Sequence, residues 1–192
     1  MPKRSLRNSM LQHRQQMPEP EVLHRSFSAQ QRLQSLAVYR KAQTVALYSP
    51  VHNEVLTMQL LRDLLANRRS VVMPRVVGEE LEFHMVRSLD DLAPGSFGIL
   101  EPIEGTGQVA IHELDLIVLP GVAFDRRGHR LGYGKGFYDR ALKTAGDRGR
   151  RVGLAYDYQL VDQLPVFEHD MQLDLLVTET QVLIFKSDHL HK

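Results

Sequence analysis

The sequence predicts a three-layer α/β fold, in which a mostly parallel sheet is flanked by helices on both faces. Short β-branched runs at 44–49 and 70–76 flank a helical pattern at 54–68, which indicates a β-α-β unit. A continuous apolar run at 114–120 is typical of a strand buried on both faces of a parallel sheet. A second β-α-β unit follows this run, and alternating units of this kind favour an α/β sheet.

The first two predicted elements are helices. Leu6 and Met10 recur at near-helical spacing among basic residues, which predicts an amphipathic helix over 3–16 that ends before Pro18. A second helix is predicted to follow Pro20. The first β-α-β unit then follows the second helix.

The remaining elements complete the sheet. They are a half-buried strand at 81–86, a long irregular connection rich in Pro and Gly, the buried strand at 114–120, a glycine-rich loop, a helix at 137–144, a strand at 151–156 and two last strands around a Glu-Thr turn. Ligands of such sheets bind beyond the carboxyl ends of the strands, where residues 120–136 are expected to lie.

Composition limits the classes of function. The 192 residues fit one domain, 1–192, and are 43% hydrophobic and 24% charged with a formal net charge of +1, which argues against disorder and against a strongly basic nucleic-acid binder. The absence of cysteine excludes disulfides, thiolate metal sites and a cysteine nucleophile. With no apolar run of membrane-spanning length, we expect a cytoplasmic protein that binds neither membranes nor nucleic acid. As a separate expectation, we favour a monomer over an oligomer.

The segment RLGYGKGFYDR, residues 130–140, combines backbone freedom with positive charge. Five of the thirteen glycines lie between Gly121 and Gly136, and Arg130 and Lys135 lie in the same stretch. Glycine lets backbone N–H groups approach an anion, and the N-terminus of the following helix adds about half a positive charge, so the segment suits a polyphosphate. It matches neither the Walker pattern nor the dinucleotide-binding pattern. A basic, solvent-exposed turn therefore stays an alternative.

Acidic residues near this loop suit magnesium, which uses one or two protein carboxylates together with substrate phosphates. Asp139 lies in the first helical turn, where a capping role is the alternative. Asp170 and Asp174 precede the final apolar strands, where a polar turn is the alternative. Lys3 and Arg7 share one helix face and can reach a phosphate, unless they form only a solvated face.

Five ordered blocks of the chain resemble the 5-formyltetrahydrofolate cyclo-ligase family. The blocks are KRSLR (3–7), YSPVHNEVLT (48–57), MPRV (73–76), LPGVAFDRRGHRLGYGKGFYDR (119–140) and HDMQLDLLVTE (169–179). The resemblance implies ATP- and Mg²⁺-dependent conversion of 5-formyltetrahydrofolate to 5,10-methenyltetrahydrofolate, with release of ADP and phosphate. It also implies a fold akin to that of some sugar-phosphate isomerases and a reduced folate, with or without a polyglutamate tail, as the small-molecule partner.

The resemblance also implies roles for individual residues. Lys135 and Arg130 would hold the phosphates as catalytic residues, and Asp139 and Asp170 would bind Mg²⁺, with Asp174 as a neighbour of that site. ATP would contact Lys3, Arg4, Arg7, Arg130, Leu131, Gly132, Tyr133, Gly134, Lys135, Gly136, Phe137 and Tyr138. The folate would contact Ser49, Glu54, Tyr133, Gly134, Lys135, Gly136 and Phe137.

Two positions depart from the family pattern. Relatives often have arginine where this chain has Tyr133, so one positive charge is missing from the loop, and they often have tyrosine at the position of Phe137. Two other classes of function stay open at this point. One is a sugar-phosphate isomerase or acyl-CoA-transferring enzyme, which would not consume ATP. The other is a folate- or nucleotide-binding regulator or an RNA-binding module, against which the near-neutral charge argues.

Overall fold

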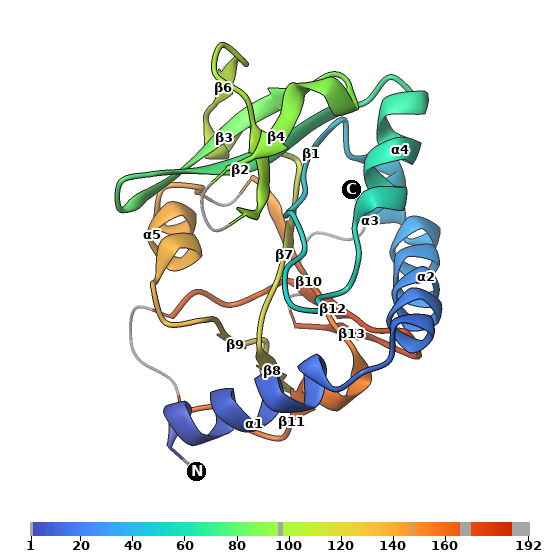
Figure 1. The fold of residues 1–192 in the computed structure, drawn as a ribbon, viewed down its shortest axis with the longest axis vertical. Coiled ribbons are helices and arrows are strands. Elements are labelled where there is room, and N and C mark those ends of the chain that lie inside the picture. Colours follow the sequence, from blue (N-terminus) through green and yellow to red (C-terminus); the bar gives the residue numbers. More distant parts are fainter. Residues whose placement is uncertain (1, 96–97, 147, 166–169, 186–192) are drawn as a thin grey trace.

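A computed structural model describes residues 2–95, 98–146, 148–165 and 170–185. Its main feature is an eight-stranded sheet, shown in Figure 1. The central five strands are parallel, and the outer pairs are antiparallel. In spatial order the strands are β13 (Val182–Ile184), β12 (Leu175–Val177), β10 (Arg150–Leu154), β7 (Leu116–Leu119), β1 (Thr44–Ala46), β2 (Ser70–Val77), β3 (Glu80–Val86) and β6 (Gln108–Val109).

Helices precede, connect and flank these strands. The α-helices are α1 (Lys3–Gln15), α2 (Glu19–Ser35), α3 (Ala37–Lys41), α4 (Met58–Ala66) and α5 (Phe137–Lys143). Short 3₁₀ helices occupy Leu89–Asp91, Ile111–Glu113 and Asp157–Gln159. Both predicted β-α-β units are confirmed, because β1 pairs parallel with β2 across α4, and β7 pairs parallel with β10 across α5.

The two β-α-β units occupy opposite halves of the sheet, one on each side of the boundary between β1 and β7. From β1 the chain proceeds to β2 on one side, and from β7 it proceeds to β10 and β12 on the other. The boundary between β1 and β7 is therefore a topological switch point, and α/β sheets bind ligands just beyond it. The segments that leave β1 and β7 at their carboxyl ends, from Leu47 and from Pro120, are the ones that lie at this point.

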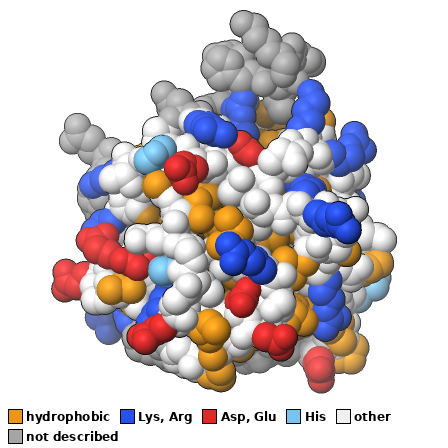
Figure 2. Space-filling view, turned by 90° about the horizontal axis from the view of Figure 1, so that it is seen from above, with side chains coloured by type: hydrophobic (Ala, Val, Ile, Leu, Met, Phe, Trp, Pro, Cys, Tyr) orange, Lys and Arg blue, Asp and Glu red, His pale blue; other side chains and the backbone are white. Residues whose placement is uncertain are grey.

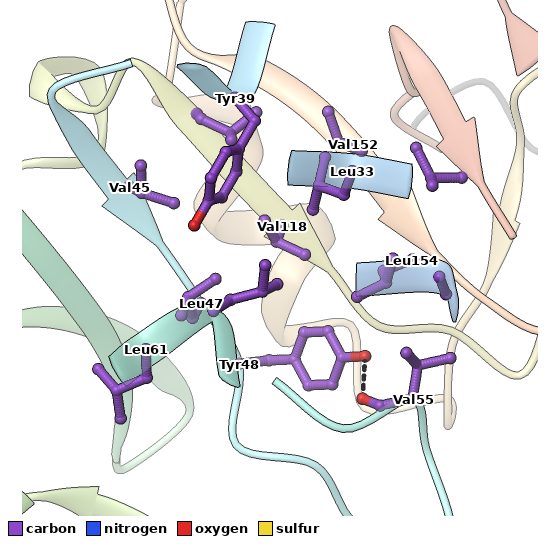
Figure 3. Close-up of a cluster of buried hydrophobic side chains, with 14 of the residues drawn as sticks. Leu33, Tyr39, Val45, Leu47, Tyr48, Val55, Leu61, Val118, Val152 and Leu154 are labelled. Atoms are coloured by element: carbon purple, nitrogen blue, oxygen red, sulfur yellow. Dashed lines mark hydrogen bonds between the residues drawn. The ribbon is translucent and has the colours of Figure 1, made fainter. Parts of the chain in front are cut away.

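The apolar run of β7 is buried on both faces of the sheet, as predicted. Leu116 and Val118 pack into a cluster with α2 and α4, which Figure 3 shows in part. Ile117 and Leu119 pack on the opposite face with Leu142 and its neighbours on α5. Side chains of a strand alternate between the two faces of its sheet, and here helices cover both faces. The sheet and the helices on its two faces form the three layers of the fold.

A small sheet and α1 lie at one end of the molecule in Figure 1. The sheet comprises β8 (Ala123–Asp125), β9 (Arg130–Leu131) and β11 (Leu160–Val161), and Leu6 and Met10 of α1 pack on it. The predicted loop at 121–136 therefore contains a hairpin. A separate two-stranded sheet joins β4 (Leu92–Pro94) to β5 (Leu100–Pro102) within the long connection.

The predicted helix at 54–68 begins later than its periodicity indicated. Residues 54–57 are not helical, because their backbone groups have other partners. The Tyr48 hydroxyl donates to the Val55 carbonyl at 2.6 Å, a bond drawn in Figure 3, and Leu56 N–H donates to the Ser26 hydroxyl. This segment is therefore not helical and places Glu54 in the connection after β1. The second helix also begins at Glu19, one residue before Pro20, because proline is tolerated in a first helical turn.

Candidate active site

A cavity of about 1120 Å³ lies at the switch point, beyond the carboxyl ends of β1 and β7. It is lined by residues from segments far apart in the sequence. Of the predicted site residues, those that line it are Lys3, Arg7, Ser49, Glu54, Asp170 and every residue from Arg130 to Asp139. Apolar side chains complete the wall and include Leu61, Met73, Leu81, Leu92, Ile99 and Leu100. The five sequence blocks thus meet at one place.

Glu54 is a buried carboxylate in the wall of this cavity. Only 4% of the residue is exposed. Its Oε1 accepts a hydrogen bond from the Tyr133 hydroxyl at 3.0 Å, and its Oε2 accepts one from the Val51 backbone N–H at 3.0 Å. Because an ionised carboxylate has about four acceptor positions, Glu54 retains capacity for donors from a ligand.

Burial raises the pKa of Glu54 above its ordinary value, and four neighbours oppose this effect. The charge of Arg14 favours the ionised form most strongly, followed by the hydrogen bonds from Val51 and Tyr133 and by the charge of Arg130. The net pKa stays raised. A carboxylate with a raised pKa in a cleft is typical of a functional site.

Arg14 is the functional candidate that the sequence did not reveal. The residue is 1% exposed, and its Nη1 lies 3.7 Å from Oε1 of Glu54. Its Nη2 donates to the Tyr133 hydroxyl, and its Nε donates to the His52 carbonyl at 2.8 Å. Arginine is rarely buried, so an arginine in a basic amphipathic helix gives no signal of such a position.

Glycines shape the loop that lines the cavity from Arg130 to Asp139. Gly134 and Gly136 have φ angles of +106° and +70°, which favour residues without a Cβ. Arg7 of α1 contacts this loop at two points. Its Nε donates to the Gly132 carbonyl at 2.9 Å, and its guanidinium lies beside Gly134. Gly136 is also the residue that precedes α5. The loop is therefore a tight turn held from outside by α1.

Arg130 and Asp139 form an ion pair at this loop. Nη2 of Arg130 lies 2.8 Å from Oδ1 of Asp139, and its Nη1 donates to the Pro120 carbonyl at 3.3 Å. Its guanidinium lies 5.4 Å from the centre of the Tyr138 ring. Among the described residues, the buried Nε of Arg130 has no hydrogen-bond partner.

A second ion pair joins α1 to the segment that precedes β12 at the cavity. Nζ of Lys3 lies 3.0 Å from Oδ2 of Asp170. Each predicted magnesium ligand is thus paired with a predicted phosphate-binding cation. In the part of the chain that the structure describes, no group of three or more His, Asp or Glu side chains could hold a metal alone. Two carboxylates on one cavity nevertheless fit a Mg²⁺ ion that also takes oxygen ligands from a phosphate.

Two predicted residues do not line the cavity. Arg4 is exposed on α1 and does not line the cavity. Asp174 is buried away from the cavity, where its Oδ2 accepts a hydrogen bond from the Arg151 backbone N–H at 2.8 Å and its Oδ1 lies 3.8 Å from Arg150. This carboxylate links two strands of the sheet, so its spacing from Asp170 has no role in the cavity. His169 lies outside the described residues.

The face shown in Figure 2 carries mixed charge. Lysine, arginine, aspartate and glutamate side chains are interspersed around hydrophobic ones near the middle of this face. Within the described ranges, no helix is both long enough and apolar enough to cross a membrane.

The comparisons identify the family. The model of the 5-formyltetrahydrofolate cyclo-ligase family matches residues 1–179. The chain belongs to this family. It is 31% identical over 189 residues to the 5-formyltetrahydrofolate cyclo-ligase of Mus musculus, with 92% of this chain and 93% of the relative covered. The Haemophilus influenzae protein of the same name is 36% identical over 157 residues, with 78% of this chain and 83% of the relative covered.

Solved structures of cyclo-ligase relatives agree with this assignment. The 5,10-methenyltetrahydrofolate synthetase of Aquifex aeolicus superposes with a TM-score of 0.87 at 37% identity and covers 100% of both chains. The Mycoplasma pneumoniae protein of that name gives a TM-score of 0.76 at 28% identity, covering 93% of this chain and 99% of the other. The chain is therefore an enzyme of the ligase class, and its family is ATP-dependent.

Proposed function

We propose that the cavity at the switch point carries out the family reaction, the ATP-dependent conversion of 5-formyltetrahydrofolate to 5,10-methenyltetrahydrofolate. The observation that carries the proposal is the convergence on one cavity of a buried acceptor, Glu54, and a cationic glycine-rich loop around Lys135. A folate ring needs a hydrogen-bond acceptor such as Glu54, and a polyphosphate needs a cationic loop such as the one around Lys135.

At the loop end, the residues neutralise phosphate charge. A formamide carbonyl is a poor electrophile, and its oxygen is a poor leaving group. The γ-phosphoryl of ATP is transferred to the formyl oxygen, N10 then attacks the activated carbon and loses its proton to solvent, and phosphate leaves with that oxygen. Transfer of this kind requires positioning and charge neutralisation rather than a covalent nucleophile. We assign these roles to Arg130 and Lys135, with Lys3 and Arg7 contributing charge from α1.

Asp139 and Asp170 would hold Mg²⁺ beside the phosphates. The ion, when bound, supplies charge neutralisation on phosphate oxygens. Both carboxylates line the cavity, and each is only partly exposed, at 29% and 15% of its side chain. Their present partners, Arg130 and Lys3, are the cations that a bound polyphosphate would attract. Binding of MgATP would therefore replace two ion pairs by two carboxylate–metal contacts and two cation–phosphate contacts.

Glu54 would accept hydrogen bonds from N–H groups of the pterin. A site built to pair such groups loses much affinity when the partner is removed. Ser49 and the Tyr133 ring lie on the same cavity. Phe137 can stack on a ring but cannot donate a hydrogen bond, so we assign it no role that needs a hydroxyl.

Purified protein mixed with MgATP and 5-formyltetrahydrofolate tests the proposed activity. We expect the near-ultraviolet absorbance of the methenyl product to rise, with ADP formed in equal amount, and neither product to form when either substrate is omitted. Absence of the methenyl product in the presence of folded protein would overturn the proposal. ATP consumption without 5-formyltetrahydrofolate would instead favour a different nucleotide-using enzyme.

Other expectations stay proposals of the same kind. We propose one domain over 1–192, a likeness of the sheet to sugar-phosphate isomerase-like folds, a monomer, a cytoplasmic location, and acceptance of folates with or without a polyglutamate tail.

A further inference from the structure

Arg14 has more polar contacts with the site than any role assigned above requires. Its guanidinium joins three segments: the connection after β1 through the His52 carbonyl, the segment after β7 through the Gly121 carbonyl at 3.2 Å, and the glycine-rich loop through the Tyr133 hydroxyl. Glu54 is its ionic partner. Arg14 itself does not line the cavity. Any influence on a ligand must therefore pass through the side chains that it holds.

The hydroxyl of Tyr133 is the link between Arg14 and Glu54. It accepts a hydrogen bond from Nη2 of Arg14 and uses its single proton to donate to Oε1 of Glu54. The Arg14 guanidinium also lies 5.5 Å from the centre of the Tyr133 ring. With its one proton committed to Glu54, this hydroxyl cannot donate to a ligand while the arrangement holds.

Burial makes this arrangement depend on charge. Arg14 is 1% exposed and Glu54 4% exposed, so each ion is deprived of water and depends on the other for compensation. Removing Arg14 would leave Glu54 as a buried carboxylate with less compensation. Its protonated form would then be favoured, and a protonated carboxyl has fewer acceptor positions for donors from a ligand.

We infer that Arg14 is a positioning residue for the folate end of the site, which it keeps ready through Tyr133 and Glu54. The buried guanidinium behind Tyr133 supplies a positive charge to this part of the site from α1. This inference rests on the proposed function, because it takes Glu54 to be the acceptor for the folate.

Steady-state kinetics on Arg14→Met test the inference. We expect the KM for 5-formyltetrahydrofolate to rise about tenfold or more and the KM for ATP to change less than about twofold, because a charge-assisted contact is lost at one end only. Arg151→Met is the matched control. Arg151 is also buried and donates to the Gly146 carbonyl at 2.7 Å, but it does not line the cavity, so its loss should not alter either KM.

Arg14→Lys keeps the inference testable if Arg14→Met does not fold. Lysine retains the charge but cannot hold the His52 and Gly121 carbonyls and the Tyr133 hydroxyl in one planar fork. We expect a rise of about threefold in the KM for the folate. This rise is smaller than that of Arg14→Met because lysine keeps the positive charge beside Glu54. An unchanged folate KM in a folded Arg14 variant, or an equal rise in both KM values, would overturn the inference.

A pH profile separates positioning from a merely structural role. The ionisable groups that influence Glu54 are Arg14, Arg130, Tyr48, Tyr133, Tyr138 and Tyr156. The tyrosines all have raised pKa values and stay neutral at physiological pH. In Arg14→Met the acidic limb of kcat/KM for the folate should therefore move to higher pH. An unmoved limb would contradict the role of Arg14.

Glu54→Gln distinguishes failure of this inference from failure of the proposed function. If Glu54→Gln leaves the folate KM unchanged, the assignment of the folate to Glu54 is wrong. If Glu54→Gln raises that KM and Arg14→Met does not, only the role of Arg14 is wrong. In the Glu54→Gln background, Arg14→Met should add little, because both changes act through the same carboxylate.

Discussion

The guanidinium of Arg130 lies 2.8 Å from the carboxylate of Asp139, so a proposed phosphate-binding cation and a proposed metal ligand neutralise each other. The same relationship recurs between Lys3 and Asp170. Opposite charges that lie close together need no counterions from solvent, and they are already beside the positions where a polyphosphate and its metal would bind.

Asp139→Asn tests this relationship. The amide removes a charged oxygen ligand, so the Mg²⁺ concentration for half-maximal turnover should rise about tenfold or more. The measurement is the rate of methenyl formation across a Mg²⁺ titration at fixed ATP. Asp162→Asn is the control, because the Asp162 side chain is fully exposed and outside the cavity. A wild-type Mg²⁺ titration in Asp139→Asn would rule out this carboxylate as a ligand.

Gly134→Ala tests the shape of the loop. A Cβ at Gly134 would meet only ordinary contacts with Arg7, at 3.5 Å or more, but the φ angle of +106° strains any residue with a Cβ. The strain costs about 1 to 3 kcal/mol unless the loop changes shape, and a changed loop should raise the KM for ATP.

The control for Gly134→Ala is Gly105→Ala. Gly105 has a φ of +87° with open space around it and does not line the cavity. It should show a similar loss of thermal stability without a change in the KM for ATP. If both variants and the wild type have equal KM values for ATP, the ATP-binding shape of the loop does not depend on Gly134.

Asp125→Asn tests how the hairpin under the loop is held. Asp125 is the fully buried last residue of β8, and its two oxygens accept hydrogen bonds from the backbone N–H groups of Arg127, His129 and Leu164. The side-chain NH₂ group of an asparagine would face one of these backbone N–H groups, and that N–H would lose its acceptor. We expect a loss of about 3 kcal/mol in the free energy of unfolding at pH 7, measured by urea denaturation.

The pH dependence of this loss has a definite sign. Burial would raise the pKa of Asp125, but hydrogen bonds from Leu164, His129 and Arg127 outweigh it and lower the pKa. The stability that this carboxylate contributes is therefore present above its unfolded pKa of about 4 and is lost as the pH falls through its folded value. The difference between wild type and Asp125→Asn should shrink on that acidification. A constant difference across the range would contradict the assignment.

The central layers of the fold were predictable because their signals are local. A strand such as Leu116–Leu119 is apolar throughout, and only burial on both faces explains that pattern. The start of α4 was not predictable in this way. The periodicity continues through 54–57, but hydrogen bonds from Tyr48 and to Ser26, which lie elsewhere in the fold, keep the segment out of the helix. The β8–β9 hairpin was missed because its strands are only two and three residues long.

The site was predictable to the extent that its residues carry chemistry in short motifs. The glycine-rich loop, Glu54 and Asp170 were predicted, and the structure places all of them on one cavity. Asp174 was a candidate only through its spacing, and its hydrogen bond to the backbone of Arg151 explains why it lies elsewhere. Arg14 could not be predicted, because its contacts come from residues 38 to 119 positions away.

The central claim is that one cavity has a folate end at Glu54 and a phosphate end at Lys135. Steady-state KM values for both substrates, measured in Glu54→Gln and in Lys135→Met, test it most directly. We predict that Glu54→Gln raises the KM for 5-formyltetrahydrofolate about tenfold with little change for ATP, and that Lys135→Met does the reverse. The claim of separate folate and phosphate ends is wrong if each variant shifts the two KM values equally. It is also wrong if Glu54→Gln raises mainly the KM for ATP and Lys135→Met mainly the KM for the folate.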